Sequence, residues 1–361
     1  MPDGFGILIL PGLVAPTTRR MAPRWMGGRG SRMKAALLVA PERIEIAEIE
    51  APVAAPTEVV IAPSRVGICG SDVSLFLGLR KTVLPLIPGH ELVGRIVEVG
   101  SAVTGLVAGQ RVVVEPNYPC GACRFCLSGR GRICPNKVSM GVTAAGAMAE
   151  QVAAPARFVW PVPDAICDED AATIEPLAVA LHAVLESGAG AGDAIAVVGC
   201  GAIGLLIAHV AAQQGLRVLA HDRSAEKRAM AAALGAECPD ASHLNRVWAE
   251  AEIHTVFECA GAAAAVEGAI AAAPRGSQVI LMGLGDKRVE IEPFRLVREG
   301  IRIGSSLIYD HPDDFARTIE MVALGALRPG MIVTHTLPFA GIEKALHLAS
   351  TGEAGKVHIT L

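Results

Sequence analysis

Four cysteines lie close together in the spacing C-x2-C-x2-C-x7-C. They are Cys120, Cys123, Cys126 and Cys134. Thiolates suit a tetrahedral zinc ion, and a site closed by four of them has no open position for chemistry. The surrounding loop is rich in glycine and proline and has little core of its own, so a bound metal would supply the folding free energy that it lacks. The spacing predicts a structural zinc; disulfide bonds and separate buried thiols are the alternatives.

A second group of metal-ligating side chains is dispersed along the chain. Cys69 lies in the run Gly-Ile-Cys-Gly-Ser-Asp, and His90 and Glu91 follow Pro-Gly. Glu175 comes much later and precedes Pro-Leu. A single cysteine or histidine is more often buried structure than a ligand. Sequence spacing alone does not join these segments into one site.

A G-x-G-x-x-G run at residues 199–204 follows an apolar segment and opens an amphipathic one. Glycines in this context let a backbone approach a dinucleotide pyrophosphate at a helix N-terminus. Asp222 lies 18 residues beyond the last glycine and is placed to bind the adenosine ribose hydroxyls, which favours NAD over NADP. Arg223 and Lys227 are nearby cations that would suit a 2′-phosphate. The cofactor-binding residues predicted are Gly199, Gly201, Ile203, Gly204, Asp222 and Lys227.

Two patterns of secondary structure surround these motifs. Short strands at 34–39, 58–66, 91–99 and 110–114, punctuated by Gly and Pro, indicate a β-rich, barrel-like domain. A helix at 175–187 follows, and strands then alternate with helices. The strands are expected at 194–198, 217–220, 255–258 and 278–282, and the helices at 203–214, 225–234 and 263–273. Such alternation predicts a parallel sheet covered by helices.

Composition limits the functions that are open to the chain. Its 361 residues suggest about two domains, and 52% hydrophobic against 19% charged residues predicts a large core. The net charge of −4, with scattered cations, argues against nucleic-acid binding. The apolar runs are too short to cross a membrane. Nine cysteines, four of them spaced as ligands, favour a reducing compartment, the cytoplasm.

Residues 1–32 differ from the rest of the sequence. An apolar stretch precedes five arginines, the reverse of the order in a signal peptide. We expect a disordered extension, with the folded chain beginning near Met33; a transit peptide is the alternative.

Taken together, the motifs resemble those of the zinc-dependent medium-chain dehydrogenase/reductase family. The resemblance covers residues 33–361 and rests on C-G-S-D, G-H-E-L-V-G, the four-cysteine loop and G-C-G-A-I-G. It implies an α/β fold with a GroES-like β-rich catalytic domain at 33–178, including a zinc lobe at about 116–136. A Rossmann domain with a doubly wound parallel sheet follows at 179–308, and 309–361 return to the catalytic domain. We expect a homo-oligomer, a dimer or a tetramer.

The resemblance also joins the dispersed ligands. It implies a catalytic zinc held by Cys69, His90 and either Glu91 or Glu175, and so two Zn²⁺ ions per chain. Asp72 would either orient His90 or cap a helix. Simple alcohol dehydrogenases carry cysteine where this chain has Glu175, whereas sorbitol, threonine and related polyol dehydrogenases carry an acid.

The implied reaction is hydride transfer from a secondary alcohol to NAD. Zinc would lower the pKa of the substrate hydroxyl, and Ser71 would pass the proton outward. Many family members continue this relay with a histidine where this chain has Ser74. Sorbitol dehydrogenases carry an arginine near Ile308, which argues against sorbitol itself. We interpret His182 as a packing or cofactor-adjacent residue rather than a relay member.

The sequence therefore predicts a zinc alcohol dehydrogenase acting on a polyol, sugar derivative or cyclitol. The first alternative is a zinc-free quinone or enoyl reductase of the same superfamily, which would lack the ligands at Cys69, His90 and Glu175. The second is a non-catalytic protein that has kept the fold.

Overall fold

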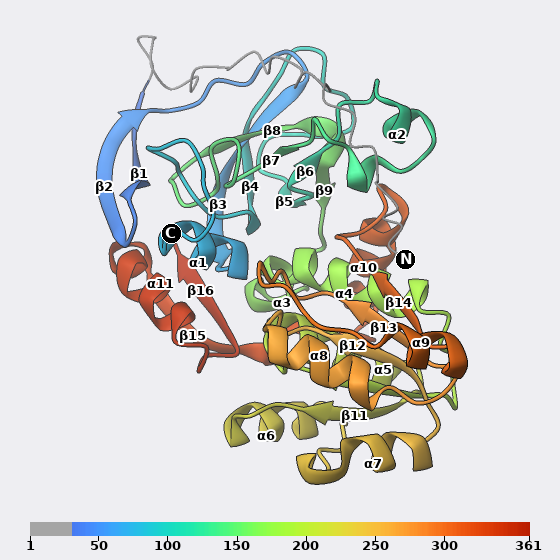
Figure 1. Cartoon of the computed structure of the whole chain (residues 1–361). Coiled ribbons are helices and arrows are strands. Elements are labelled where there is room, and N and C mark those ends of the chain that lie inside the picture. The colour runs from blue at the N-terminus through green and yellow to red at the C-terminus, as the bar shows by residue number, and fades with distance from the viewer. Residues whose placement is uncertain (1–30) are drawn as a thin grey trace, which may run out of the picture.

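The computed structural model describes residues 31–361, so residues 1–30 of the predicted extension lie outside the described chain. Two sheets organise the rest, a mostly antiparallel sheet in the upper half of Figure 1 and a parallel sheet in the lower half. The α/β architecture predicted from the sequence is confirmed.

The upper sheet has the strand order β15-β16-β3-β4-β5-β9, and β8 also pairs with β3. Its central strands supply the core: Val59, Ile61 and Val66 of β3 have no exposed surface. The strands are β3 (Glu58–Gly67), β4 (Glu91–Val99), β5 (Arg111–Val114), β8 (Val152–Pro155), β9 (Val159–Pro161), β15 (Val333–Pro338) and β16 (Lys356–Thr360). Two short ladders accompany it, formed by β1 (Arg32–Ala40) with β2 (Arg43–Glu50) and by β6 (Asn117–Tyr118) with β7 (Val138–Ser139).

The lower sheet is parallel and has the order β11-β10-β12-β13-β14. Every residue of β10 is buried, as expected for a strand covered on both faces. The strands are β10 (Ala194–Val198), β11 (Arg217–His221), β12 (Ile253–Glu258), β13 (Gln278–Leu281) and β14 (Arg302–Ser305). The helices around them are α5 (Ala202–Gln213), α6 (Ala225–Ala233), α7 (Leu244–Glu250), α8 (Ala263–Ala272) and α9 (Pro293–Glu299).

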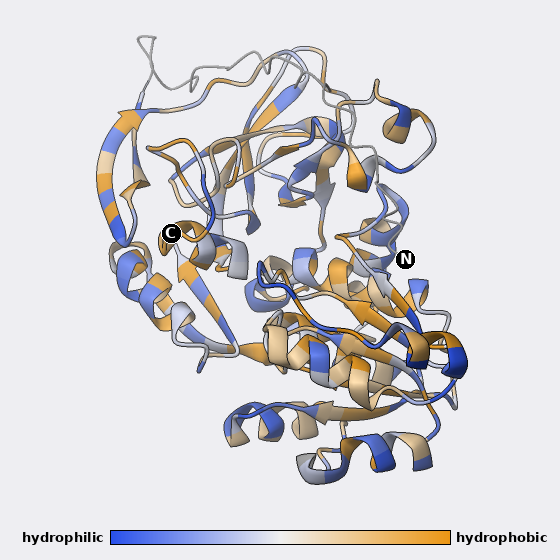
Figure 2. Ribbon diagram, viewed as in Figure 1, coloured by the Kyte–Doolittle hydropathy of each residue, from blue (hydrophilic) through white to orange (hydrophobic). Residues whose placement is uncertain are grey.

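β11 lies on one side of β10 and β12 on the other, which makes the carboxyl end of β10 a topological switch point. Ligands of doubly wound sheets bind at such points. Figure 2 shows hydrophobic residues on the strands of this sheet and hydrophilic stretches on the outer helices α6 and α7. Within residues 31–361, the structure has no helix with the length and apolar character needed to cross a bilayer.

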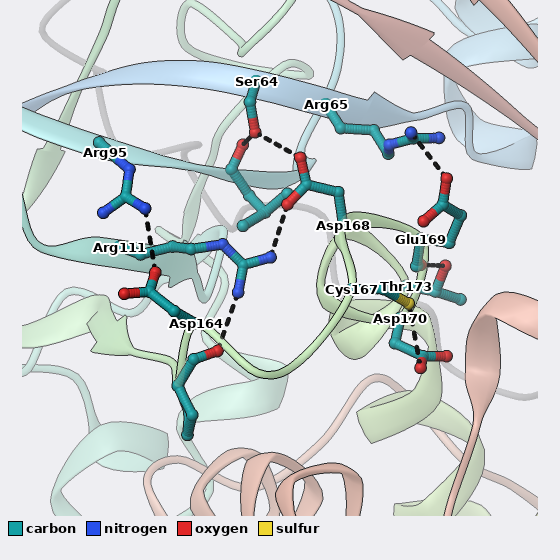
Figure 3. A network of polar contacts seen from close by, with 12 residues as sticks. Ser64, Arg65, Arg95, Arg111, Asp164, Cys167, Asp168, Glu169, Asp170 and Thr173 are labelled. Carbon is teal, nitrogen blue, oxygen red and sulfur yellow. Dashed lines mark hydrogen bonds and ion pairs between the residues drawn. The ribbon is translucent and has the colours of Figure 1, made fainter.

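Helices α3 (Asp168–Ala172) and α4 (Ile174–Glu186) connect the two halves of the molecule. Figure 3 shows how α3 is fastened to the upper sheet: Asp168 accepts hydrogen bonds from Arg111 at 2.6 Å and from Ser64 at 3.1 Å. Arg65 pairs with Glu169 at 2.7 Å. These contacts fix the first turn of α4, which begins two residues beyond α3.

The C-terminal segment contributes to both halves. Helix α10 (Asp313–Ala323) packs against α4, whereas α11 (Ile342–Ser350) packs against α1 (Gly70–Phe76) and the edge of the upper sheet. Strand β16 then pairs antiparallel with β3, with His358 opposite Gly67. This ladder brings the start of β16 close to the start of β4.

Candidate active site and metal centres

The four cysteines of the predicted zinc lobe converge on one point. The Cys123 sulfur lies 3.5 Å from that of Cys126 and 3.8 Å from that of Cys134. The sulfurs of Cys120 and Cys126 are 3.9 Å apart. Four sulfurs at ~2.3 Å from a tetrahedral zinc lie about 3.8 Å from one another, so the cluster fits the ion. All nine cysteines are free thiols, which excludes the disulfide alternative.

The lobe has little else to hold it. Its helix α2 (Arg124–Leu127) has no buried residue. The backbone N–H groups of Ala122 and Cys123 lower the pKa of the exposed Cys120 thiol to about 6, which favours the thiolate that zinc requires. The donor chemistry and the absence of a core in this segment both match a closed structural site.

A second donor set is assembled from two distant segments. The ligand atoms of Cys69, His90 and Glu91 lie within 4.8 Å of one another. Cys69 precedes α1, and Glu91 is the first residue of β4, opposite Gly67 of β3. A side chain on Gly67 would collide with the Glu91 carboxylate, so this glycine leaves room for the acid. The structure thus joins segments that sequence spacing could not.

The sequence left two roles open for Asp72, orienting His90 and capping a helix, and the contacts of its carboxylate fit both. Its carboxylate accepts hydrogen bonds from the backbone N–H of Cys69 at 2.9 Å and of Gly89 at 3.0 Å. It also lies 3.5 Å from Nδ1 of His90, which leaves Nε2 of that ring as the nitrogen for a metal. Burial alone would raise the pKa of Asp72, but the charge of His90 and these hydrogen bonds hold it below its ordinary value. Asp72 therefore both caps α1 and orients His90.

Lys356 is a member of the site that sequence reasoning missed. Its ammonium group donates to Oε1 of Glu91 at 2.6 Å and also contacts Oε2. Burial would lower the pKa of Lys356, yet the Glu91 carboxylate raises it above its ordinary value. A lysine within the apolar strand β16 is the signal that could have found it, because lysine is rarely buried without a partner.

Glu175 lies beside this donor set rather than within it. Its side chain is buried in the first turn of α4, and burial raises its pKa to about 7, assisted by the charge of Glu91 and opposed by that of His90. The Tyr309 hydroxyl is a hydrogen-bonding partner of Glu175. Of the two glutamates left open as ligands, the structure groups Glu91 with Cys69 and His90.

The residues considered for the proton relay are placed differently. Ser71 lies in the first turn of α1, next to the metal-ligand set. The hydroxyl of Ser74 donates to the carbonyl of Gly70 at 2.9 Å and so turns back on its own helix. His182 is buried between two carboxylates, with Nδ1 2.6 Å from Asp314 and Nε2 3.2 Å from Glu186. It fastens α4 to α10, which agrees with a packing role.

The glycine-rich turn has the shape of a phosphate cradle. A side chain on Gly199 or Gly204 would collide with the protein's own backbone, whereas one on Gly201 would meet nothing within 4 Å. Space is therefore kept open above Gly201, at the N-terminus of α5, and Ile203 lies in the first turn of that helix. An N-terminus with free N–H groups and no side chain above it fits the pyrophosphate of a dinucleotide.

Asp222 closes the other side of this cradle. It accepts hydrogen bonds from the backbone N–H of Cys200 at 2.8 Å and of Ser224 at 2.9 Å, and each oxygen keeps a lone pair for a ribose hydroxyl. Lys227 is placed less favourably for a cofactor, because its ammonium group is buried against the carbonyl of Ala354. That contact ties α6 to the segment before β16.

Known proteins match this chain along most of its length. Residues 55–164 match the alcohol dehydrogenase GroES-like domain, and residues 202–323 match the zinc-binding dehydrogenase family. An L-threonine 3-dehydrogenase of Stenotrophomonas maltophilia (strain K279a) is 31% identical over 329 residues, which cover 88% of this chain and 96% of that protein.

Two solved structures resemble this one closely. A zinc-binding dehydrogenase of Sinorhizobium meliloti 1021 bound to NADP has a TM-score of 0.86 at 30% identity, and an alcohol dehydrogenase of Escherichia coli CFT073 complexed with NADH has 0.85 at 29%. Both alignments cover 92% of this chain and 100% of the other.

The chain belongs to the zinc-dependent medium-chain alcohol dehydrogenase family. It is a zinc-binding dehydrogenase, an oxidoreductase that acts on CH–OH groups with a nicotinamide cofactor. The enzyme class predicted from the sequence is thereby confirmed, against both a zinc-free reductase and a non-catalytic protein.

Proposed function

We propose that the enzyme oxidises a secondary hydroxyl of a polyol, sugar derivative or cyclitol, with NAD as the hydride acceptor. The observation that carries this proposal is the buried acid Glu175 beside Cys69, His90 and Glu91. A carboxylate has lone pairs for the additional hydroxyls of such a substrate, whereas a thiolate in the same place would accept hydrogen bonds weakly.

The side chains divide the work between them. Cys69, His90 and Glu91 would hold a catalytic zinc, one of two per chain, which as a Lewis acid would polarise the substrate hydroxyl. Glu175, with a pKa near 7, can take up a proton at neutral pH, and Ser71 passes it outward. Lys356 neutralises one of the carboxylates that crowd the site.

The cofactor preference rests on Asp222. A carboxylate at the ribose repels a 2′-phosphate, so NAD is preferred to NADP. Asp222→Ala should weaken NAD binding and narrow the gap to NADP, whereas Asp240→Ala, at an exposed acid in the loop before α7, should not. Stronger binding of NADP than of NAD by the wild-type enzyme would refute this assignment and make Arg223 the first residue to examine.

The outer edge of the parallel sheet supports a homo-oligomer. All four residues of the edge strand β14 are exposed. Beside it lie exposed apolar side chains, Phe294 and Val297 of α9 and Leu284. An exposed edge strand with apolar side chains beside it suits pairing with a second copy. Sedimentation should give a multiple of the chain mass of 37.3 kDa, and Ile303→Lys should give the monomer.

Nine free thiols support a reducing, cytoplasmic location.

A substrate screen tests the proposal directly. Polyols, sugar acids, cyclitols and amino-alcohols are offered with NAD and with NADP, and reduction is followed at the nicotinamide absorbance. We expect NAD reduction by at least one class that carries several hydroxyls. Activity confined to simple monohydric alcohols would contradict the proposed substrate class.

A further inference from the structure

A cavity of about 180 Å³ lies between the zinc lobe and residues 308–311. Asn117, Lys137 and Tyr309 are among the residues that line it. The Asn117 amide donates to the Tyr309 hydroxyl at 3.3 Å, and Tyr309 is also the hydrogen-bonding partner of Glu175. Tyr309 therefore contacts both the cavity and the proposed catalytic carboxylate.

The backbone that presents Tyr309 is constrained. Ile308 has a φ of 48°, a left-handed conformation that is unfavourable for a β-branched residue. Strained residues of this kind persist where the surrounding structure over-determines them, and they cluster at functional sites. The cavity is thus bordered by a segment whose conformation is held in place.

Most charged groups in the cavity wall have a partner of opposite charge. Arg132 pairs with Asp310 at 2.6 Å and with Glu186 at 2.7 Å. Glu115 accepts from His311 at 2.8 Å. These groups are satisfied by the protein itself and leave no charge to recognise a ligand.

Lys137 is the exception among these wall residues. Its ammonium group donates to the carbonyl of Arg132 at 3.0 Å, and no carboxylate of residues 31–361 pairs with it. Burial lowers the pKa of Lys137, the charge of Cys134 raises it, and the nearby Arg80 lowers it. The charge of Glu175 also raises the pKa of Lys137.

Arg80 adds a second positive charge to the same region. It lies in the loop after α1 and is exposed, and no acidic side chain of the described chain pairs with it. Arg80 and Lys137 repel each other because no carboxylate lies between them as a shared partner. A bound anion between the two side chains would relieve that repulsion.

We infer that Lys137 selects substrates in which an anionic group, a carboxylate or a phosphate, accompanies the hydroxyl that is oxidised. This inference rests on the proposed function and narrows its substrate class. Lys137 acts as a specificity residue: it lines the same cavity as Tyr309, the partner of Glu175, so it would hold the anionic end of the substrate while the hydroxyl faces Cys69 and His90.

A competing role for Lys137 is purely structural. Four thiolates and one zinc ion carry a net charge of −2, and Lys137 follows the last of these thiolates by three residues. As a counter-ion to the lobe, it would affect zinc retention and all substrates equally. The two roles therefore predict different responses to the same substitution.

The test uses matched sets of substrates with four and six carbons: erythritol, erythronate and erythritol 4-phosphate, and sorbitol, gluconate and sorbitol 6-phosphate. Lys137→Met should lower kcat/KM for the preferred anionic class ~10–100-fold, the effect of losing a charged hydrogen bond, and leave the neutral polyols within about twofold. Lys137→Arg should restore part of the loss. Lys344→Met, at an exposed lysine of α11, is the matched control. Whether Lys137→Met lowers kcat/KM more for the carboxylates or for the phosphates identifies the anion that Lys137 binds.

Calorimetric binding of the same compounds to the enzyme–NADH complex provides a readout that does not require turnover. We expect at least one anion to bind more tightly than its neutral polyol, and this advantage to disappear in Lys137→Met with both zinc ions retained. Equal losses for all compounds, or loss of zinc, would overturn the inference in favour of the counter-ion role. If no compound is oxidised, the proposed function fails and the inference is decided by binding alone. It then fails if the anions bind no more tightly than the neutral polyols, or if their advantage persists in Lys137→Met.

Discussion

The zinc lobe and the catalytic site, formed by Cys69, His90 and Glu91 and called the cleft from here on, hold similar donors in opposite ways. The lobe draws its four thiols from fifteen consecutive residues, and its helix α2 buries nothing. The cleft draws Cys69, His90 and Glu91 from the ends of α1 and β4, and its neighbours in β3 are completely buried. The lobe therefore needs the metal to have a structure, whereas the cleft has a structure that can receive the metal.

This difference predicts what a substitution in each site should affect. A change in the cleft should remove chemistry and leave the fold, because the surrounding sheet supports the ligands. A change in the lobe should remove local order first and chemistry second. Five substitutions can break or sharpen this contrast.

The largest effect is expected for Cys69→Ser. Loss of a ligand at the catalytic site should lower kcat by at least ~100-fold, while the melting temperature and the zinc of the lobe are retained. Metal analysis, calorimetry and turnover check this together. Cys167→Ser, at an exposed thiol outside both sites, is the control. A cooperative loss of fold in Cys69→Ser would contradict the contrast.

Cys123→Ser should produce the opposite pattern. The lobe should lose its zinc and become sensitive to protease within residues 116–136, while the catalytic zinc stays bound. Activity should fall less than in Cys69→Ser, because the cleft ligands lie on other elements. Limited proteolysis with mass spectrometry locates the cuts. A lobe that stays protected without zinc would show that it has a core of its own.

Glu175→Ala separates metal tuning from substrate recognition. We expect a loss of ~10–100-fold in kcat/KM for a polyol, typical of a group next to a metal site. Glu175→Cys should retain metal but not activity on polyols. The comparison is made against a simple secondary alcohol in both variants. Equal losses on the two substrates would mean that Glu175 acts on the metal alone and would weaken the polyol assignment.

His358, buried in β16, should make the free energy of unfolding sensitive to acid. Burial, with the charges of Lys356 and Arg65, lowers its pKa to about 3, so in the folded state it stays neutral where an unfolded histidine is protonated. The unfolded state binds the extra proton between about pH 6.5 and 3, so stability falls as the pH falls through this window. His358→Gln should reduce the slope of unfolding free energy against pH by up to about 1.4 kcal/mol per unit, a limit that is approached below about pH 6.

Urea unfolding from pH 7 to pH 5 measures this slope. Because zinc thiolates also protonate in acid, the difference between wild type and variant is the relevant quantity, and the exposed His335→Gln serves as the control. An unchanged slope in His358→Gln would show that His358 does not determine the acid sensitivity of the fold.

The smallest effect is expected for Arg132→Met, which removes the ion pairs between the lobe and the rest of the chain at Glu186 and Asp310. The pairs of Arg132 with Asp310 and Glu186 are partly exposed, and such pairs contribute roughly 1 kcal/mol or less each. We expect a change in kcat/KM of a few fold with both zinc ions retained. Arg130→Met, in the same loop, should change nothing measurable. A loss as large as that of Glu175→Ala would mean that the two regions are not independent.

The same contrast explains what could be predicted from the sequence. The lobe was visible in its spacing alone, because its ligands are local. Strands β3, β4 and β5 and the alternation from α4 to β13 followed from hydrophobic pattern and glycine placement. The cleft needed a family resemblance, because nothing in the spacing of Cys69 and His90 shows that they meet. The helices α7 and α9 and the strand β14 were not predicted, since seven-residue helices and an exposed four-residue strand carry little periodic signal.

Tyr309 and Lys137 could not be found from residue type or spacing, and residue type marks Lys356 only as a lysine in a strand, without showing its partner. Each acquires its role from a partner far away in the chain: Glu91 for Lys356, Glu175 for Tyr309, and a shared cavity wall for Lys137. Pairs of this kind form only in the tertiary structure, and no local sequence pattern predicts them.

The ion pair between Glu91 and Lys356 has a consequence for the order in which the enzyme matures. A ribosome makes the chain from its N-terminus, so all four thiols of the lobe are available 222 residues before Lys356 is added (356 − 134). The lobe can capture zinc while the nascent chain still lacks β16. Glu91 stays without its cationic partner, and β3 without its last neighbour, until β16 has been synthesised. The charge balance of the catalytic donors is therefore completed only when the last strand of the chain has been made, whereas the donors of the structural ion are complete much earlier.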